Sequence, residues 1–207
     1  LGSRTKLTLP DGTLVWLNAG SRITYSQGFG VGNRKIELIG EGYFEVKRNE
    51  EVPFLVKTNS LLVKVLGTKF NFRDYPDDAE AIVSLSEGKV ALNNLLKKEK
   101  EAFLLPNERV VLNKKNGRMH VEYSTVSNAL QWTNGYLFFD EELLPDVVKE
   151  LERSYNVKIQ IASDTLNTFR FYGNFVHREQ NIQEVLEALS ATRKIHYIIE
   201  GHNITLY

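Results

Sequence analysis

Apolar and polar residues alternate with the two-residue period of a β-strand in Ile36-Glu37-Leu38-Ile39-Gly40-Glu41-Gly42-Tyr43-Phe44-Glu45-Val46. The same alternation runs through Val65-Leu66-Gly67-Thr68-Lys69-Phe70-Asn71-Phe72. Glycine interrupts each segment where a side chain is expected, and a glycine inside a strand marks a bulge or the close approach of another backbone. Both segments therefore predict strands with a special local geometry.

The rest of residues 1–123 carries the same strand pattern. Asp11-Gly12 and Asn116-Gly117 are hairpin signals between alternating runs. The charge-rich segment Asn93–Glu101 departs from the alternation, and we expect it to form an exposed hairpin tip. Short strands separated by turn signals predict an antiparallel β-sandwich or a coiled β-sheet. The expected strands are Lys6–Pro10, Thr13–Asn18, Arg34–Leu38, Gly42–Lys47, Pro53–Lys57, Leu61–Leu66, Lys69–Tyr75, Ala81–Ser86, Lys89–Leu92, Ala102–Leu105, Val110–Asn113 and Met119–Tyr123.

The pattern then changes to a mixture of helices and strands. Helical spacing of apolar residues runs from Leu143 to Tyr155. A second helical run follows Asn181, which forms a capping-box pattern with Glu184. The flanking strands are expected at Tyr136–Phe139, Lys158–Ile161, Phe169–Tyr172, His196–Ile199 and Asn203–Leu206.

The chain is therefore expected to contain two domains. Residues 1–123 form the all-β domain, residues 124–131 a linker, and residues 132–207 a small α+β domain of βαβ type. Trp132 and Tyr136 lie beside the linker. We expect these two aromatic side chains to pack the domains together rather than to bind a ligand.

The composition is that of an ordinary globular protein, with 42% hydrophobic and 25% charged residues among 207. Cysteine is absent, which excludes disulfides and thiolate sites. No apolar run reaches the roughly 18 residues of a membrane span. The chain begins at Leu1 and its sole methionine is Met119. We therefore expect a fragment from which a membrane or targeting segment has been removed.

Charge is unevenly distributed although the formal net charge is zero. Residues 1–120 hold 19 basic and 14 acidic side chains, an excess of +5, whereas residues 121–207 hold 7 and 12, an excess of −5. An imbalance of this size is typical of solvated faces. It is not the footprint of nucleic-acid binding, which calls for a clustered basic face, so no nucleic-acid partner is expected.

The residue patterns do not favour catalysis. The four histidines lack the spacing of a helical zinc site, so neither a metal nor another cofactor is expected. Glu41 and Glu45 lie about 13 Å apart along an extended strand, which is too far for a glycosidase pair, and we expect both on a solvated sheet face. The glycines of Gln27–Asn33 precede a strand rather than a helix, so they predict a hairpin loop and not a phosphate site.

The dipeptide Gly67-Thr68 has two interpretations. In the one we favour, Gly67 marks a bulge or a close contact between sheets, and Thr68 is an ordinary strand residue. In the other, the Thr68 hydroxyl attacks the preceding carbonyl and converts the amide to an ester, which water then cleaves. Such a step needs a strained bond and a small residue before the hydroxyl, and glycine meets the second requirement.

Residues 1–123 contain six motifs in order: Leu9-Pro10-Asp11-Gly12-Thr13 with Trp16-Leu17-Asn18-Ala19-Gly20-Ser21, Leu38–Val46, Pro53–Val56, Val65–Phe70, Ser86–Val90 and Leu105–Glu108. Read together, they make this region resemble the FecR domain of transmembrane anti-sigma regulators. The later motifs are Gly135–Phe139, Leu143–Tyr155 and Phe171–Tyr207. They make residues 132–207 similar to the small C-terminal domain that often follows in this family and is related to the STN domain of secretins and TonB-dependent transducers.

The resemblance implies a relay of signals rather than an enzyme. Such proteins have a cytosolic segment that binds an extracytoplasmic-function sigma factor, one membrane helix, and a periplasmic region. The periplasmic region receives a signal from the signalling domain of an outer-membrane TonB-dependent transporter. This chain would be the periplasmic region of a single-pass inner-membrane protein, and it would reach the sigma factor only through the missing cytosolic segment. Some members break their own chain at a Gly-Thr bond, which is the reason for considering Gly67-Thr68.

Strand addition is the expected mode of partner binding. The last strand, formed by Asn203, Ile204, Thr205 and Leu206, would offer an edge to a partner strand. The acidic excess of residues 121–207 would steer a basic partner. The alternative function is a carbohydrate- or ligand-binding β-sandwich module that uses exposed aromatic rings for stacking. A hydrolase ranks last because no nucleophile is paired with a base.

Overall fold

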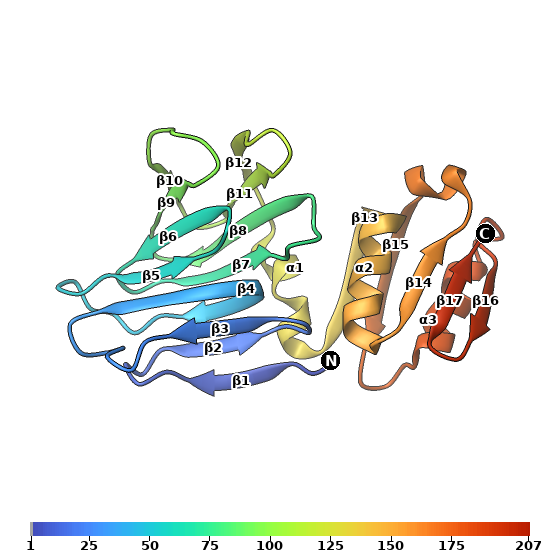
Figure 1. The fold of residues 1–207 in the computed structure, drawn as a ribbon, viewed down its shortest axis with the longest axis horizontal. Helices are drawn as coiled ribbons and strands as arrows, with labels where there is room; N and C mark the ends of the chain where they lie inside the picture. Colours follow the sequence, from blue (N-terminus) through green and yellow to red (C-terminus); the bar gives the residue numbers. More distant parts are fainter. Residues whose placement is uncertain (1) are drawn as a thin grey trace. The chain divides into compact units, whose positions relative to one another are not determined.

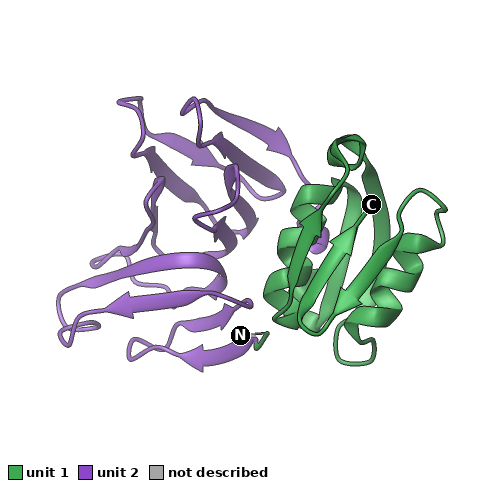
Figure 2. Cartoon of the chain, turned by 45° about the vertical axis from the view of Figure 1, so that its right-hand side comes forward, with its two compact units in different colours: residues 1–3, 131–207 green, residues 4–130 purple. Residues whose placement is uncertain are grey.

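The computed structural model describes residues 2–207, which form two compact units (Figure 1, Figure 2). The first, called here the β unit, comprises residues 4–130. The second, the α+β unit, combines residues 131–207 with Gly2 and Ser3. Each unit has a hydrophobic core built only from its own residues, as expected of a domain that folds around its own apolar surface.

Within residues 4–130 the chain forms a 12-stranded sheet. Its main path runs in the order β10-β9-β6-β5-β4-β7-β8-β11-β12, while β2 and β3 also pair with β4, and β1 pairs with β2. The strands are β1 (Thr5–Thr8), β2 (Leu14–Leu17), β3 (Arg22–Tyr25), β4 (Arg34–Glu45), β5 (Phe54–Lys57), β6 (Leu61–Val65), β7 (Lys69–Asp74), β8 (Glu80–Glu87), β9 (Val90–Asn94), β10 (Ala102–Leu104), β11 (Glu108–Asn113) and β12 (Met119–Tyr123).

The long strand β4 is shared by two halves of this sheet. Its first part pairs with β3 and β5, and its second part, from Gly40 onward, pairs with β2 and β7. Both halves contribute to one core, in which Phe44, Phe54, Phe70 and Phe72 are fully buried. This arrangement confirms the β-rich fold class predicted from the sequence.

Gly40 is the point at which β4 passes from one half to the other. Its φ of +98° lies in a region that residues with a side chain rarely adopt. A Cβ atom at this position would lie 2.5 Å from Ser21 Oγ and 2.9 Å from Ser21 Cα. Glycine is therefore required at position 40 both by the backbone conformation and by the close approach of Ser21.

Three details of the β unit differ from the prediction. One strand, β4, replaces the two expected at Arg34–Leu38 and Gly42–Lys47, because Gly40 lets the chain continue from one half of the sheet to the other; the strand ends at Glu45. The pair β4–β5 is parallel, whereas an antiparallel sheet was expected. The short strand β3 was not predicted, because its side chains are mostly exposed and give little hydrophobic signal.

The α+β unit has the predicted order of strands and helices. Two sheets are present within residues 131–207: β13 pairs with β15, and β14, β17 and β16 form a three-stranded sheet in that order. The elements are β13 (Tyr136–Leu143), α2 (Leu144–Tyr155), β14 (Lys158–Ile161), the 3-10 helix η2 (Asp164–Thr168), β15 (Arg170–Val176), α3 (Ile182–Ser190), β16 (Tyr197–Glu200) and β17 (Asn203–Leu206).

The two helices are stabilised by local signals that the sequence predicts. In α2, Pro145 lies in the first turn, where its missing N–H is not needed. In α3, the Asn181 side chain accepts a hydrogen bond from the Glu184 N–H at 3.1 Å, and Glu184 Oε2 accepts one from the Asn181 N–H at 2.8 Å. The predicted capping box is confirmed.

The segment that was expected to be a linker is helical. It contains α1 (Val126–Ala129), and its last residue begins the 3-10 helix η1 (Gln131–Asn134). Helix α1 packs against β8 of the β unit. Across residues 2–207, no helix combines the length and the apolar character needed to span a membrane.

Candidate interaction site

The last strand of the chain is not an edge strand. β17 lies between two neighbours, pairing in parallel with β14 and antiparallel with β16. Ile204 and Leu206 are buried in the hydrophobic core of the α+β unit. The prediction that Asn203, Ile204, Thr205 and Leu206 offer a free edge is therefore wrong. The alternating pattern of β17 is equally compatible with an edge strand and with a central strand, and only the long-range pairing with β14 decides between these positions.

The open edge of the three-stranded sheet is β16. The His196 N–H donates to the Tyr207 carbonyl at 2.8 Å, and the Tyr207 N–H donates to the His196 carbonyl at 3.0 Å. Doubly bonded pairs alternate along an antiparallel ladder, so Ile198–Thr205 and Glu200–Asn203 are the next bonded pairs. The N–H and C=O groups of the intervening residues, Tyr197 and Ile199, consequently point away from β17, toward the open side.

The side chains of β16 make this edge different from the opposite edge, β14. Ile198 is 50% exposed and Ile199 is 40% exposed, although they occupy the middle of a strand. On β14, by contrast, Ile159 is buried and the outward-facing residues are Lys158 and Gln160. Natural sheets usually protect an edge with lysine, proline or a bulge. β16 has none of these features, so Tyr197–Glu200 is the candidate interaction site.

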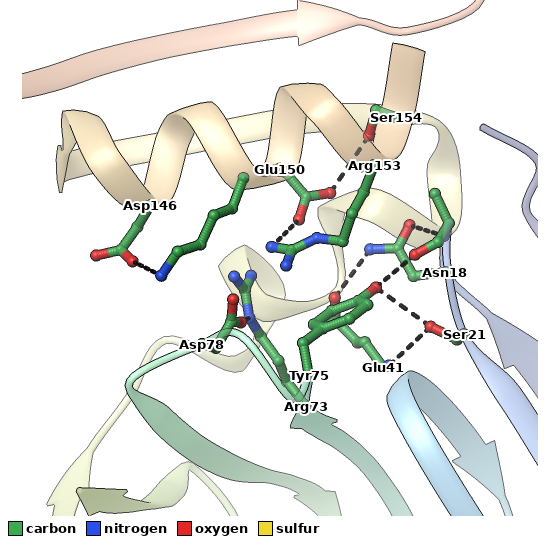
Figure 3. A network of polar contacts seen from close by, with 12 residues as sticks. Asn18, Ser21, Glu41, Arg73, Tyr75, Asp78, Asp146, Glu150, Arg153 and Ser154 are labelled. Atoms are coloured by element: carbon green, nitrogen blue, oxygen red, sulfur yellow. Dashed lines mark hydrogen bonds and ion pairs between the residues drawn. The ribbon is translucent and has the colours of Figure 1, made fainter. Parts of the chain in front are cut away.

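Glu41 occupies a buried polar network rather than a solvated face, which corrects the prediction for this residue. Its side chain is 5% exposed. Figure 3 shows the arrangement, in which Glu41 Oε2 accepts a hydrogen bond from Asn18 Nδ2 at 2.8 Å. Glu41 Oε1 accepts another from Asn71 Nδ2, also at 2.8 Å. The prediction failed because neighbouring strands bring these two amides to the carboxylate, and nothing in the sequence next to Glu41 indicates them.

The network extends to the turn between β2 and β3. Ser21 Oγ accepts a hydrogen bond from the Glu41 N–H at 2.8 Å and lies 3.2 Å from the Tyr75 hydroxyl (Figure 3). The Tyr75 hydroxyl donates to the Ala19 carbonyl at 2.8 Å. These bonds hold the turn against β4 and β7. The arrangement positions backbone, and the carboxylate serves as an acceptor for fixed donors.

Tyr43 lies on the same side of β4 as Glu41. Its ring contacts Trp16, with the ring centroids 5.3 Å apart. Burial, together with the nearby Glu45 carboxylate, raises the pKa of Tyr43 to about 12. The phenol therefore stays protonated and donates toward Glu45 Oε1 at 3.5 Å. This side of the strand is a packed, hydrogen-bonded surface.

Gly67 and Thr68 form the bend between β6 and β7. A Cβ on Gly67 would lie 2.7 Å from Arg48 Cβ, so glycine is required there by close approach. Thr68 is buried, and its hydroxyl donates to the Lys89 carbonyl at 3.1 Å. To attack the Gly67 carbonyl, the hydroxyl would have to leave this partner. These contacts explain both residues by packing and hydrogen bonding. Self-cleavage at this bond stays a prediction.

We expect the purified chain to give one intact mass, because the Thr68 hydroxyl is committed to Lys89. The matched variant Thr68→Val keeps the shape of the side chain, removes the hydroxyl and should give an intact chain as well. It should also lose about 1 kcal/mol of unfolding free energy, because the Lys89 carbonyl loses its donor. Mass spectrometry and urea denaturation measure the two effects. A fragment beginning at Thr68, present in the unchanged protein and absent from the variant, would instead establish self-cleavage.

Other predicted positions are less informative. Trp132 is buried and Tyr136 is partly buried, and their predicted role between the domains stays a prediction. Within residues 2–207, no group of three or more histidine, aspartate or glutamate side chains is arranged to hold a metal ion. The exposed aromatic residues of the β unit, as far as it is described, are Tyr25, Phe103 and Tyr123. They lie on β3, β10 and β12, which are not paired with one another, so they do not form a stacking row.

Comparison with known proteins extends over the whole chain. A family model described as "FecR protein" matches residues 1–91, and one described as "FecR, C-terminal" matches residues 136–206. A candidate anti-sigma factor from Parabacteroides distasonis ATCC 8503, solved at 1.65 Å, shares 34% sequence identity and superposes with a TM-score of 0.90, covering 100% of this chain and 95% of that one. A 2.50 Å structure with the same description gives a TM-score of 0.89 at 34% identity and covers 94% of that chain. No curated protein matches the chain.

Proposed function

This chain belongs to the FecR family, and from that premise we propose that it is the periplasmic sensor portion of a transmembrane anti-sigma regulator. In this proposal it receives a signal from an outer-membrane TonB-dependent transporter by binding the transporter's signalling domain. The signal reaches an extracytoplasmic-function sigma factor through a cytosolic segment outside this chain. The likeness to a candidate anti-sigma factor, over 95% of the chain solved in that structure, supports the regulatory role.

The observation that carries the binding proposal is the unprotected edge of β16. Tyr197 and Ile199 direct their backbone N–H and C=O groups outward, as an added strand requires. Ile198 and Ile199 supply exposed apolar area beside these groups. The partner strand would therefore pair with β16, so that the site differs by one strand from the position expected from the sequence. The acidic excess of residues 121–207 favours a basic partner surface.

Ile199→Pro tests this mode of binding. The Ile199 N–H points to the open side, so proline removes the donor that a partner would use and leaves the bonded pairs between β16 and β17 in place. We expect the affinity for the transporter's signalling domain to fall by roughly tenfold or more, the loss that about 1.4 kcal/mol of binding free energy represents. Isothermal titration calorimetry with residues 1–207 measures it.

Two variants serve as controls. Ile199→Val keeps the N–H and a β-branched side chain, and it should bind almost as well as the unchanged chain. Tyr172→Ala removes an exposed aromatic ring from β15, in the other sheet, and should also leave binding unchanged. Thermal melts establish that each variant is folded. Equal affinities of Ile199→Pro and Ile199→Val for the signalling domain would exclude strand addition at β16. If both variants still bind the signalling domain as tightly as the unchanged chain, the proposed sensor role stands and only the binding site is wrong.

A further inference from the structure

Two hairpins of the β unit end side by side (Figure 1). One joins β9 to β10 and the other joins β11 to β12. Asn94 Nδ2 donates to the Gly117 carbonyl at 2.9 Å and so ties the two ends together. Gly117 has a φ of +64°, and a Cβ there would lie 3.1 Å from Lys97 Cγ. Residues 95–101 and 115–118 therefore form one feature, which we call the twin tip.

The twin tip is strongly basic. Five of its side chains are basic and two are acidic, and all seven residues are exposed. Glu99 Oε2 is engaged by Asn94 Nδ2 at 3.2 Å, which places one of the two acidic groups at the base of the hairpin. The basic residues are Lys97, Lys98, Lys100, Lys115 and Arg118. The two hairpins are distant in sequence, so the concentration of positive charge arises only when the fold brings them together.

Two adjacent leucines are exposed within this basic surface. Leu95 is 42% exposed and Leu96 is 43% exposed. A single exposed leucine is common on soluble proteins, but consecutive exposed leucines at a hairpin end, beside three lysines, need an explanation. Neither leucine belongs to the hydrophobic core of the β unit, whereas Leu92 and Leu104 of the same hairpin do.

Backbone N–H groups at the start of the first hairpin end, and in the second hairpin end, have hydrogen-bond partners. The Leu95 N–H donates to the Ser60 carbonyl at 2.9 Å, and Asn94 Oδ1 accepts from the N–H groups of Leu96 and Lys97 at 2.9 and 3.2 Å. In the second hairpin, Asn113 Oδ1 accepts from the N–H groups of Lys115 and Asn116 at 3.1 and 3.2 Å. These bonded N–H groups can enter a region of low water content without the cost of unpaired donors.

We propose that the twin tip docks on the surface of a bilayer that contains anionic phospholipids. The lysine and arginine groups pair with phosphate groups of the lipids, and Leu95 and Leu96 enter the boundary between headgroups and acyl chains. The composition favours a bilayer over a protein partner, because lysine is depleted in protein interfaces whereas clustered lysine is typical of binding to anionic lipid. Long lysine side chains can also extend from the apolar boundary back to the headgroups.

Vesicle sedimentation tests the proposal. Residues 1–207 should bind vesicles that contain phosphatidylglycerol, bind poorly to vesicles of phosphatidylcholine alone, and dissociate as salt is raised. Lys97→Glu combined with Lys98→Glu should reduce binding roughly tenfold or more, because each basic group near an anionic surface contributes substantially. Leu95→Ser combined with Leu96→Ser should reduce binding while leaving the charge unchanged.

The matched control is Lys35→Glu combined with Lys64→Glu. It makes the same change in net charge at exposed positions on β4 and β6, outside the twin tip, and should retain binding. Equal losses in the control and in the twin-tip variants would show attraction by net charge alone and overturn the proposal. Equal binding to both kinds of vesicle would also overturn the proposal. The same holds if an equivalent concentration of inorganic phosphate displaces the chain from the vesicles, or if the chain binds acidic proteins but no vesicles. Melting temperatures report whether each variant remains folded.

Discussion

Replacing Gly40 with alanine is expected to remove about 3 to 5 kcal/mol of unfolding free energy from the β unit. A φ of +98° is costly for any residue with a Cβ. The added methyl group would also meet Ser21 Oγ at 2.5 Å, and Ser21 cannot withdraw without losing its bond from the Glu41 N–H. A loss of this size is a large part of the stability of a typical domain. Urea denaturation of the purified chain measures it.

Gly12→Ala provides the matched control. Gly12 also has a positive φ, +85°, but a Cβ there would meet no atom within 4 Å. Its substitution should therefore cost only the conformational term, about 1 to 2 kcal/mol. The difference between the two variants isolates the contact with Ser21. Equal losses of unfolding free energy would mean that backbone conformation alone requires glycine at position 40, and that the close contact with Ser21 is not decisive.

Local sequence patterns predict much of this fold because the interactions behind them are local. Alternation places Phe44, Phe70 and Phe72 in the core, since a two-residue period follows directly from strand geometry. The Asn181–Glu184 capping box is equally local, as its two bonds close within one helical turn. Glycine in a strand pattern signals close approach, and Gly40 and Gly67 both have it.

The candidate interaction surfaces and the buried network around Glu41 are harder to predict because they depend on partners that are distant in sequence. β17 alternates like an edge strand but is central, since β14 and β16 enclose it. Glu41 resembles a surface carboxylate, yet its two amide partners are 23 and 30 residues away. The twin tip is likewise assembled from two hairpins through Asn94 and Gly117. In each case the decisive contact is a long-range strand pairing or a contact between loops.

Glu41→Gln is expected to remove about 2 to 4 kcal/mol of unfolding free energy, although it changes only one oxygen to an amide nitrogen. The carboxylate accepts from two amide donors, whereas glutamine must direct its own NH₂ group at one of them. Asn18 cannot rotate to accommodate this change. Its Oδ1 already accepts from the Ala19 N–H at 2.9 Å and from Arg4 Nε at 3.0 Å. The glutamine oxygen would therefore face Asn18, and its NH₂ group would face the Asn71 NH₂ group in a buried site.

Comparison with two further variants identifies the cause of the loss. Glu37→Gln makes the same chemical change at an exposed position on the same strand and should alter the unfolding free energy by less than about 0.5 kcal/mol. Glu41→Gln combined with Asn71→Asp moves the carboxylate across the hydrogen bond, so that the glutamine NH₂ again faces an acceptor. This double variant should recover part of the lost stability. An unchanged unfolding free energy in Glu41→Gln, or a full loss without recovery in the double variant, would mean that the amide pair is not what holds Glu41 in the network.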